Sequence, residues 1–301
     1  MDLHRIILGC CIAGFFCGSL SAEPVLNASM GEDQLAVTVD GALFTVYKFS
    51  TQQKYPYFFP VNGPVSGKSI TTETSEPYPH HHSLFFGCDR VNGGNYWQEG
   101  NERGQILSDK IELIQAEGDR IEFRQECVWS RPGAPSPFRD SRTVVIQAPT
   151  ATVRILDFTL TLHPQMDVTI LNTNHSLFAA RITPELSIPQ GGTMISSRGQ
   201  AGEKATAGQL AEWIDFGGLR AGVFEGLAIM DSPQNPWHPS PWFSRDYGFF
   251  SPTPFNWLKE GKLELKKGED LTLRYRVVVH AGSAKQADIE GWYQSWIPKN
   301  D

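Results

Sequence analysis

Three consecutive histidines, His80, His81 and His82, begin the segment of this chain that is richest in side chains suited to chemistry. Imidazole groups exchange protons near neutral pH and also bind metals. Pro77 and Pro79 favour extended backbone before them, so the sequence predicts a strand on which His80 and His82 share one face and His81 takes the other. His80 and His81 are therefore candidate acids, bases or metal ligands. The alternative is a solvated or structural histidine run.

Polar and aromatic side chains follow the histidines in a glycine-containing loop. Guanidinium and amide groups suit recognition of hydroxyl and carboxylate groups, which makes Arg90 and Asn92 candidate substrate-binding residues. Gly93 and Gly94 would let the backbone approach a ligand closely. Trp97 is a candidate stacking platform for a sugar ring. The alternative is that Trp97 anchors the loop in the core.

A second polar cluster, Asn172 to Ser176, follows the apolar pair Ile170-Leu171. A polar run directly after a strand often forms the edge of a site. His175 is a candidate general acid or base, and Asn174 beside it is a candidate substrate-binding residue. Glu185 is either an acid–base partner for His175 or a surface carboxylate.

Four prolines between Asp231 and Trp242 predict a rigid, non-helical strip. This strip presents Asp231 and His238 as candidate catalytic groups and Asn235 as a candidate hydroxyl-binding residue. Trp237 and Trp242 are candidate platforms for sugar rings. A stiff loop of this composition is typical of carbohydrate clefts, and some protein-binding loops share it.

Several function classes lack support in the sequence. It contains no nucleophile elbow, phosphate-binding loop, dinucleotide fingerprint or HEXXH motif. The net charge of −7 and the absence of a basic stripe argue against nucleic acid as a partner. The sequence also contains no CxxC pair, which argues against a cysteine-based zinc site.

Residues 1–22 read as a secretory signal peptide with a cleavage site near Ala22. The sequence therefore predicts a secreted or periplasmic protein whose mature chain, 23–301, is a single domain. No later run of about 20 apolar residues appears, so no membrane span is expected in the mature chain. Removal of the signal leaves Cys88 and Cys127, which form either one disulfide or two separate buried thiols.

Strand patterns dominate the mature chain. Asp40-Gly41 is a hairpin turn signal between two apolar alternating runs. Ile121 to Trp129 and Leu271 to Val279 alternate apolar and polar residues, which is typical of antiparallel sheets with one buried face. Ala287 to Trp296 has helical spacing of its apolar residues. We therefore predict an all-β protein, a large antiparallel β-sandwich with a short C-terminal helix.

Three sequence blocks together resemble a known family. HHHSLFFGCDRVNGGNYW is similar to that family's histidine-containing block, MDSPQNPWHPSPWFSRDYGFFSPTPFN to its second signature, and GEDLTLRYRVVVHAG to its closing strand. The family is labelled "methane oxygenase PmoA" and is treated as a domain of unknown function. The likeness covers roughly residues 58–282. Tyr78 and His82 depart from the family's usual Asp-His-Pro-His-His block and its following Arg.

The PmoA label does not imply methane oxidation here, because the true particulate methane monooxygenase subunit is an integral membrane protein. Members of the resembled family are typical of bacteria that break down complex glycans, which implies a secreted, carbohydrate-related role. Asn172 to Phe178 is also similar to the Asn-His-Ser-Tyr-Phe element of aldose 1-epimerases, which are themselves large β-sandwiches. That likeness implies a galactose-mutarotase-like supersandwich and a general-acid role for His175. No residue here matches the glutamate base of that family.

The favoured interpretation is an enzyme acting on a small sugar or oligosaccharide by histidine-based acid–base chemistry, as a hydrolase, lyase or epimerase. One alternative is a non-catalytic carbohydrate-binding module that relies on its tryptophans. Another is a copper or zinc protein, with the metal held by His80, His81 and one distant histidine. No other cofactor is predicted.

Overall fold

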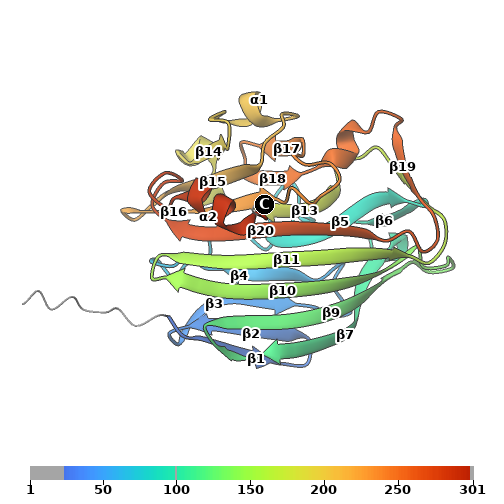
Figure 1. The fold of residues 1–301 in the computed structure, drawn as a ribbon, viewed down its shortest axis with the longest axis horizontal. Helices are drawn as coiled ribbons and strands as arrows, with labels where there is room; N and C mark the ends of the chain where they lie inside the picture. Colours follow the sequence, from blue (N-terminus) through green and yellow to red (C-terminus); the bar gives the residue numbers. More distant parts are fainter. Residues whose placement is uncertain (1–23, 99, 299–301) are drawn as a thin grey trace, which may run out of the picture.

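The computed structural model describes residues 24–98 and 100–298, so the expected signal peptide lies outside the described part. Two antiparallel β-sheets lie face to face and make up most of the molecule (Figure 1). The all-β sandwich expected from the alternating patterns is confirmed. No helix of the described residues is long and apolar enough to cross a membrane.

The larger sheet has twelve strands in which β13 and β5 lie next to each other near the middle of the order β17-β18-β13-β5-β4-β3-β2-β1-β8. Strands β6, β12 and β19 join it at the side. The bounds are β1 Leu26–Met30, β2 Gln34–Val39, β3 Ala42–Lys48, β4 Tyr57–Val61, β5 Leu84–Val91, β6 Gly94–Tyr96, β8 Glu117–Gly118, β12 Val168–Leu171, β13 Ser176–Arg181, β17 Trp242–Arg245, β18 Phe249–Pro252 and β19 Lys262–Leu265.

The smaller sheet has eight strands in the order β14-β15-β16-β20-β11-β10-β9-β7. Its long central strands cross the front of the molecule in Figure 1. The bounds are β7 Gln105–Gln115, β9 Arg120–Ser130, β10 Phe138–Thr150, β11 Val153–Pro164, β14 Thr193–Ser196, β15 Trp213–Arg220, β16 Val223–Asp231 and β20 Leu271–Ala281.

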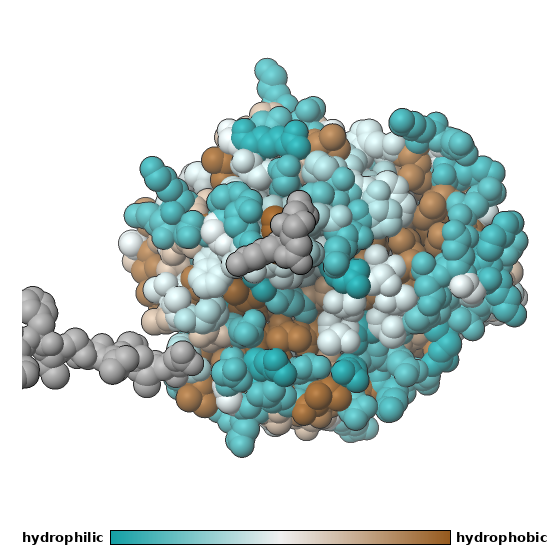
Figure 2. All heavy atoms as spheres, in the orientation of Figure 1, coloured by the Kyte–Doolittle hydropathy of each residue, from teal (hydrophilic) through white to brown (hydrophobic). Residues whose placement is uncertain are grey.

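Local sequence patterns account for these strands. In β9, Ile121, Phe123, Cys127 and Trp129 are buried together with Gln125, while Arg124 and Glu126 on the other face are exposed, as the alternation predicted. Strands β2 and β3 are joined at Asp40-Gly41, where both residues have positive φ, 50° and 78°. A two-residue turn of this kind matches the twist of the paired strands. Polar side chains dominate the face shown in Figure 2, with scattered apolar residues.

Helices are few and short, and the C-terminal one, α2 (Ile289–Trp296), lies where the helical spacing predicted it. Asp288 caps it by accepting a hydrogen bond from the backbone N–H of Gly291 at 3.2 Å. Its Ile289 and Tyr293 pack in an apolar cluster with Trp213 of β15. The remaining helical turns are α1 Glu203–Thr206, η1 Asn101–Arg103, η2 Pro184–Leu186, η3 Ile188–Gln190 and η4 Pro254–Trp257.

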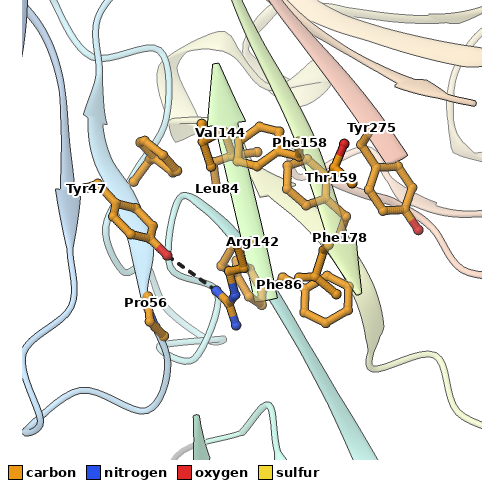
Figure 3. A pocket seen from close by; sticks show the side chains of 13 residues that line it. Tyr47, Pro56, Leu84, Phe86, Arg142, Val144, Phe158, Thr159, Phe178 and Tyr275 are labelled. Carbon is orange, nitrogen blue, oxygen red and sulfur yellow. Dashed lines mark hydrogen bonds between the residues drawn. The ribbon is translucent and has the colours of Figure 1, made fainter. Parts of the chain in front are cut away.

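An ion pair lies buried between the two sheets. The Arg142 guanidinium donates to both carboxylate oxygens of Asp140, at 2.7 and 3.0 Å, and Trp129 Nε1 donates to the same carboxylate at 2.8 Å. Tyr47 of the opposite sheet points at Arg142 across the core (Figure 3), and burial raises the pKa of Tyr47. A cavity of about 20 Å³ lies beside Arg142. It has room for about one water molecule, so the core holds no ligand-sized site at this place.

Candidate functional site

The histidine run lies beside the larger sheet, in turns that precede β5. The expectation of a strand there is wrong, because residues 75–80 form a bridge and two turns and Ser83 has a positive φ of 55°. His82 stacks on Tyr57 with ring centroids 5.0 Å apart. His80 and His81 instead lie together, with centroids 4.5 Å apart. The turns therefore separate His82 from His80, which an extended strand would have placed on one face.

Strand pairing brings the second polar cluster to the same place. Strand β13 pairs with β5 so that Ser176 lies opposite Cys88. This register places His175 and Thr173, just before β13, next to Asp89 of β5. Alternation along β5 sends Phe86 into the core against Trp129 and leaves Asp89 on the other face of the sheet.

His175 and Asp89 form a hydrogen-bonded pair. Nδ1 of His175 is 3.0 Å from Oδ2 of Asp89, and the carboxylate is almost fully buried. The Thr173 hydroxyl donates to the other carboxylate oxygen, and the backbone N–H of His175 donates to Thr173 Oγ1 at 2.9 Å. Because an ionised carboxylate only accepts hydrogen bonds, the proton of the neutral imidazole lies on Nδ1. The other ring nitrogen, Nε2, is the one available for proton exchange with a ligand.

Aromatic rings surround this pair. His80 lies edge-on to His175 with centroids 5.9 Å apart, and Trp97 stacks on His175 at the same separation. His81 packs against Phe249 with ring centroids 4.3 Å apart. The structure therefore brings His80, His81 and His175 into one cluster.

Two ring nitrogens in this cluster are buried without a hydrogen-bond partner among residues 24–98 and 100–298. They are Nδ1 of His81 and Nε1 of Trp97. Buried polar atoms in folded proteins nearly always have a partner, either protein or an ordered water or ligand. Both atoms belong to the rings packed around the His175–Asp89 pair.

His81 is held neutral. Burial, reinforced by the neighbouring His80 and Arg181 charges, lowers its pKa to about 2. An imidazole in this state cannot serve as a proton donor from the charged form near neutral pH. A role as a charged acid does not fit this state, and the candidate roles of His81 as a base or a metal ligand stay predictions.

His175 also faces an open cleft of about 570 Å³, which we call the His175 cleft. It is lined by Asp89, Arg90, Asn92, Gly93, Gly94, Asn95, Gln98, Arg103, Thr169, Leu171 and His175. Arg90 lies at its edge and donates to the backbone oxygen of Asn172 at 2.7 Å. The amide of Asn92 is used within the protein, since it donates to Asp167 O and accepts from Thr169 N–H. Asn174 is half-buried in the bend before His175.

The third predicted cluster lies elsewhere. His238 Nδ1 is 3.1 Å from Asp231 Oδ2, and His238 Nε2 is 3.4 Å from the hydroxyl of Tyr293 in α2. His238 lines a separate cleft of about 610 Å³ that shares no lining residue with the His175 cleft. The structure thus does not bring His238 and Asp231 into one cleft with His175.

Three of the proposed sugar-binding side chains are buried or hydrogen-bonded within the protein. Trp97 and Trp242 are completely buried, and Trp242 Nε1 donates to the backbone oxygen of Ala211 at 2.9 Å. Asn235 donates to Asp231 at 2.7 Å and pairs with the backbone of Arg274. The stacking role expected for Trp97 and Trp242 is therefore wrong in this conformation. Trp237 is half-buried against Phe255, with ring centroids 5.1 Å apart.

Three further expectations can be compared with the structure. Cys88 and Cys127 are free buried thiols, so the candidate disulfide is absent, and burial raises the pKa of both. Glu185 is exposed and pairs with Arg220 at 3.4 Å, which makes it a surface carboxylate. No group of three or more His, Cys, Asp or Glu side chains suited to a metal ion occurs within the described residues.

Sequence patterns did not indicate Gln98 or Arg103 as parts of this region, and they assigned no role to Thr173 and no partnership between Asp89 and His175. The signal for Thr173 was its place two residues before His175 in the polar cluster. Arg103 had no local signal, because only the turn of η1 brings it to the cleft.

The family model that matches this sequence covers residues 34–294 and is described as a family of unknown function, DUF6807. The chain belongs to this family. That description does not connect it with methane oxygenase. Functionally curated proteins give no match to the sequence.

Solved structures of sugar epimerases are distantly similar to this chain. A putative aldose 1-epimerase from Escherichia coli K12 is 12% identical with a TM-score of 0.35, covering 85% of this chain and 98% of its own. Galactose 1-epimerase from Lactobacillus acidophilus NCFM is 9% identical with a TM-score of 0.41, covering 86% and 98%. A putative aldose 1-epimerase from Klebsiella pneumoniae subsp. pneumoniae MGH 78578 is 10% identical with a TM-score of 0.40, covering 92% and 86%. Because the sequence identities and TM-scores are so low, no ligand or chemistry of these proteins is assigned to this chain.

Proposed function

We propose that this protein is a carbohydrate-active enzyme that binds a small sugar or oligosaccharide in the His175 cleft and moves a proton at Nε2 of His175. The observation that carries this proposal is the His175–Asp89 pair, which joins a buried carboxylate to an imidazole lining an open polar cleft. A fixed tautomer beside a ligand-sized space is what general acid–base catalysis needs.

Each residue of the pair has a distinct part in this chemistry. Asp89 keeps the Nδ1 proton in place, so neutral His175 presents a lone pair at Nε2 and accepts a proton from a sugar hydroxyl or carbon. The resulting imidazolium is stabilised by the Asp89 carboxylate and returns the proton from the same atom to a leaving or ring oxygen. In elimination the accepted proton comes from a ring carbon, in epimerisation from a sugar hydroxyl or carbon, and in hydrolysis from the attacking water.

The rings behind His175 support the same proposal. His81 stays neutral and offers a hydrogen-bonding nitrogen, while Trp97 Nε1 offers a buried donor. Neither ring lines the His175 cleft, so an ordered water, and not the sugar, would complete their hydrogen bonding without a change of charge.

The binding-module alternative loses its main support, because two of its three tryptophans are buried. From the sequence we retain two further proposals. One is that the protein is secreted or periplasmic. The other is that the family labelled "methane oxygenase PmoA" and the matched family of unknown function are the same group.

The test compares two histidine variants that differ in position but share a chemical setting. His175→Asn removes the proposed acid–base group. His163→Asn is the matched control, since His163 is also paired with a carboxylate, Asp270 at 2.9 Å, on the other sheet. Sugars and oligosaccharides would be screened with the wild-type protein for reducing-end release, unsaturated products and anomer exchange.

On any substrate so found, we expect His175→Asn to lower kcat by about 10²- to 10⁴-fold, the usual contribution of a positioned acid–base group. The His163 variant should keep wild-type turnover. Circular dichroism and melting temperature would establish that both variants fold. Unchanged turnover in a folded His175→Asn protein would refute the proposed chemistry.

A further inference from the structure

Two arginines from separate elements line the His175 cleft. Arg90 lies near the end of β5, and Arg103 ends the helical turn η1. Both are exposed, so their guanidinium groups reach solvent at the cleft. The chain as a whole carries a net charge of −7, which makes a locally basic cleft a departure from the rest of the molecule.

The acidic side chain of the cleft does not neutralise these arginines. Asp89 is the single carboxylate among its described lining residues, and it is almost fully buried and already bonded to His175 and Thr173. Neither Arg90 nor Arg103 forms an ion pair with any carboxylate of the described residues. The cleft therefore presents two positive charges without a negative partner from those residues.

The turn between β5 and β6 holds the Arg90 edge of the cleft in place. Arg90 itself has a positive φ of 55°, and its Nη1 donates to Asn172 O at 2.7 Å. Arg131 stabilises the turn by donating hydrogen bonds to the backbone oxygens of Gly93 at 2.7 Å and Asn92 at 3.3 Å. The hydrogen bond from Nη1 leaves the remaining donors of Arg90 for a ligand.

We propose that the ligand of the His175 cleft is an acidic sugar, whose carboxylate or sulfate group binds Arg90 and Arg103 while its ring lies against His175. This inference rests on the proposed function for the location of the sugar. Planar guanidinium groups match carboxylate and sulfate oxygens in pairs of charge-assisted hydrogen bonds. A neutral sugar would leave the two positive charges without a counterpart.

The experiment measures binding of matched sugars by calorimetry and ligand-observed NMR. D-galactose, D-galacturonate and D-galactose 6-sulfate share a ring and differ at C6, as do D-glucose, D-glucuronate and D-glucose 6-sulfate. Comparison within each set shows the effect of charge, and comparison between the two sets shows the effect of stereochemistry. The two acidic forms in each set distinguish carboxylate from sulfate recognition. The full chain is used as wild type and as Arg90→Gln, Arg103→Gln and the double variant. Arg124→Gln on β9, 63% exposed, is the control.

We expect at least one acidic sugar to bind about tenfold or more tightly than its neutral counterpart, with the preference weakening as salt rises. Each arginine variant should reduce the preference and the double variant should abolish it, while Arg124→Gln retains it. Equal binding of neutral and acidic sugars, absence of acidic-sugar binding, or a preference that survives in the double variant would overturn the proposal.

The outcomes also separate this inference from the proposed function. If turnover depends on His175 but the arginine variants discriminate sugars like the wild type, the acidic ligand is wrong and the acid–base role stands. If acidic sugars bind through the arginines while His175→Asn leaves turnover intact, the cleft is correct and the catalytic role is wrong.

Discussion

Asp89 and His175 hold each other through both side chain and backbone. The carboxylate lies 3.0 Å from the imidazole Nδ1, and the backbone N–H of Asp89 donates to the backbone oxygen of His175 at 3.0 Å. Thr173 links the same two residues by accepting from one and donating to the other. The orientation of the imidazole is therefore tied to the pairing of β5 with β13, which continues into the bend that carries His175.

Replacing Asp89 by Asn should impair turnover more than binding. The change removes a charge-assisted hydrogen bond, which is worth about 1.5–3 kcal/mol, so kcat should fall by about ten- to a hundredfold. KM should change little, because both carboxylate oxygens of Asp89 are hydrogen-bonded to Thr173 and His175 although Asp89 lines the cleft. Steady-state kinetics of Asp89→Asn against Asp270→Asn, which alters the surface pair with His163, checks this expectation. An equal fall in both variants would contradict it.

The buried His81 should make the fold sensitive to acid. Its pKa is about 2 when folded and 6.5 when unfolded, so the unfolded chain takes up a proton first as the pH falls. The stability that neutral His81 contributes is complete above about pH 6.5 and decreases below it. Between pH 7 and pH 5 the loss should be about 2 kcal/mol.

His81→Phe isolates this effect, because a phenyl ring retains the packing against Tyr78 and Phe249. Urea unfolding of both proteins at pH 7 and pH 5 gives the difference in unfolding free energy. The free energy of unfolding of the variant, relative to that of the wild type, should be higher at pH 5 than at pH 7. A difference that does not change with pH would show that His81 does not titrate in the unfolded state as expected.

His280 should have the opposite pH dependence. It is fully buried, with Nε2 2.7 Å from Asp215 and Nδ1 3.0 Å from Gly282 O. Burial lowers its pKa, but the charge and hydrogen bond of Asp215 outweigh this and raise the pKa overall. A raised folded pKa means that the stabilisation is complete below the ordinary value of 6.5 and is lost as the pH rises through the folded value.

The double variant His280→Gln/Asp215→Asn removes both charges of this pair while keeping polar groups in place. The wild type should have a higher free energy of unfolding than the double variant, and this difference should be larger at pH 6 than at pH 9. Chemical denaturation at the two pH values measures this. A larger advantage at pH 9 would mean that the assigned charge state of His280 is wrong.

The ion pair in the sandwich core should be costly to break from one side. Arg142→Met leaves the Asp140 carboxylate buried without its guanidinium partner (Figure 3 shows Arg142). Removing one partner of a buried pair typically costs about 3–5 kcal/mol. The double variant Arg142→Met/Asp140→Leu should regain part of that loss. Denaturant unfolding measures the free energy of unfolding of each variant. Arg124→Met is the exposed control, whose unfolding free energy should fall by about 1 kcal/mol or less. Similar decreases for Arg142→Met and Arg124→Met would contradict the prediction.

Much of the fold follows from local patterns. The alternation in β9 and the Asp40-Gly41 turn predict strands and a hairpin, because side-chain direction and turn geometry depend on adjacent residues. The helical spacing before Trp296 predicts α2 for the same reason. The conformation of the histidine run does not follow from local patterns. Its bridges and turns depend on contacts such as the one between Arg181 and Ser75, which are 106 residues apart.

Strand alternation and the C-terminal helix depend on near neighbours in the chain, so the sequence predicts them, and it also shows which residue types are available for acid–base chemistry. Which of these residues meet depends on the tertiary structure. Asp89 and His175 are 86 residues apart and become partners through strand pairing, whereas His238 is directed to a different cleft. The buried positions of Trp97 and Trp242 were decided in the same way. The physical reason is that strand pairing and burial depend on segments distant in the chain, which local periodicity does not encode.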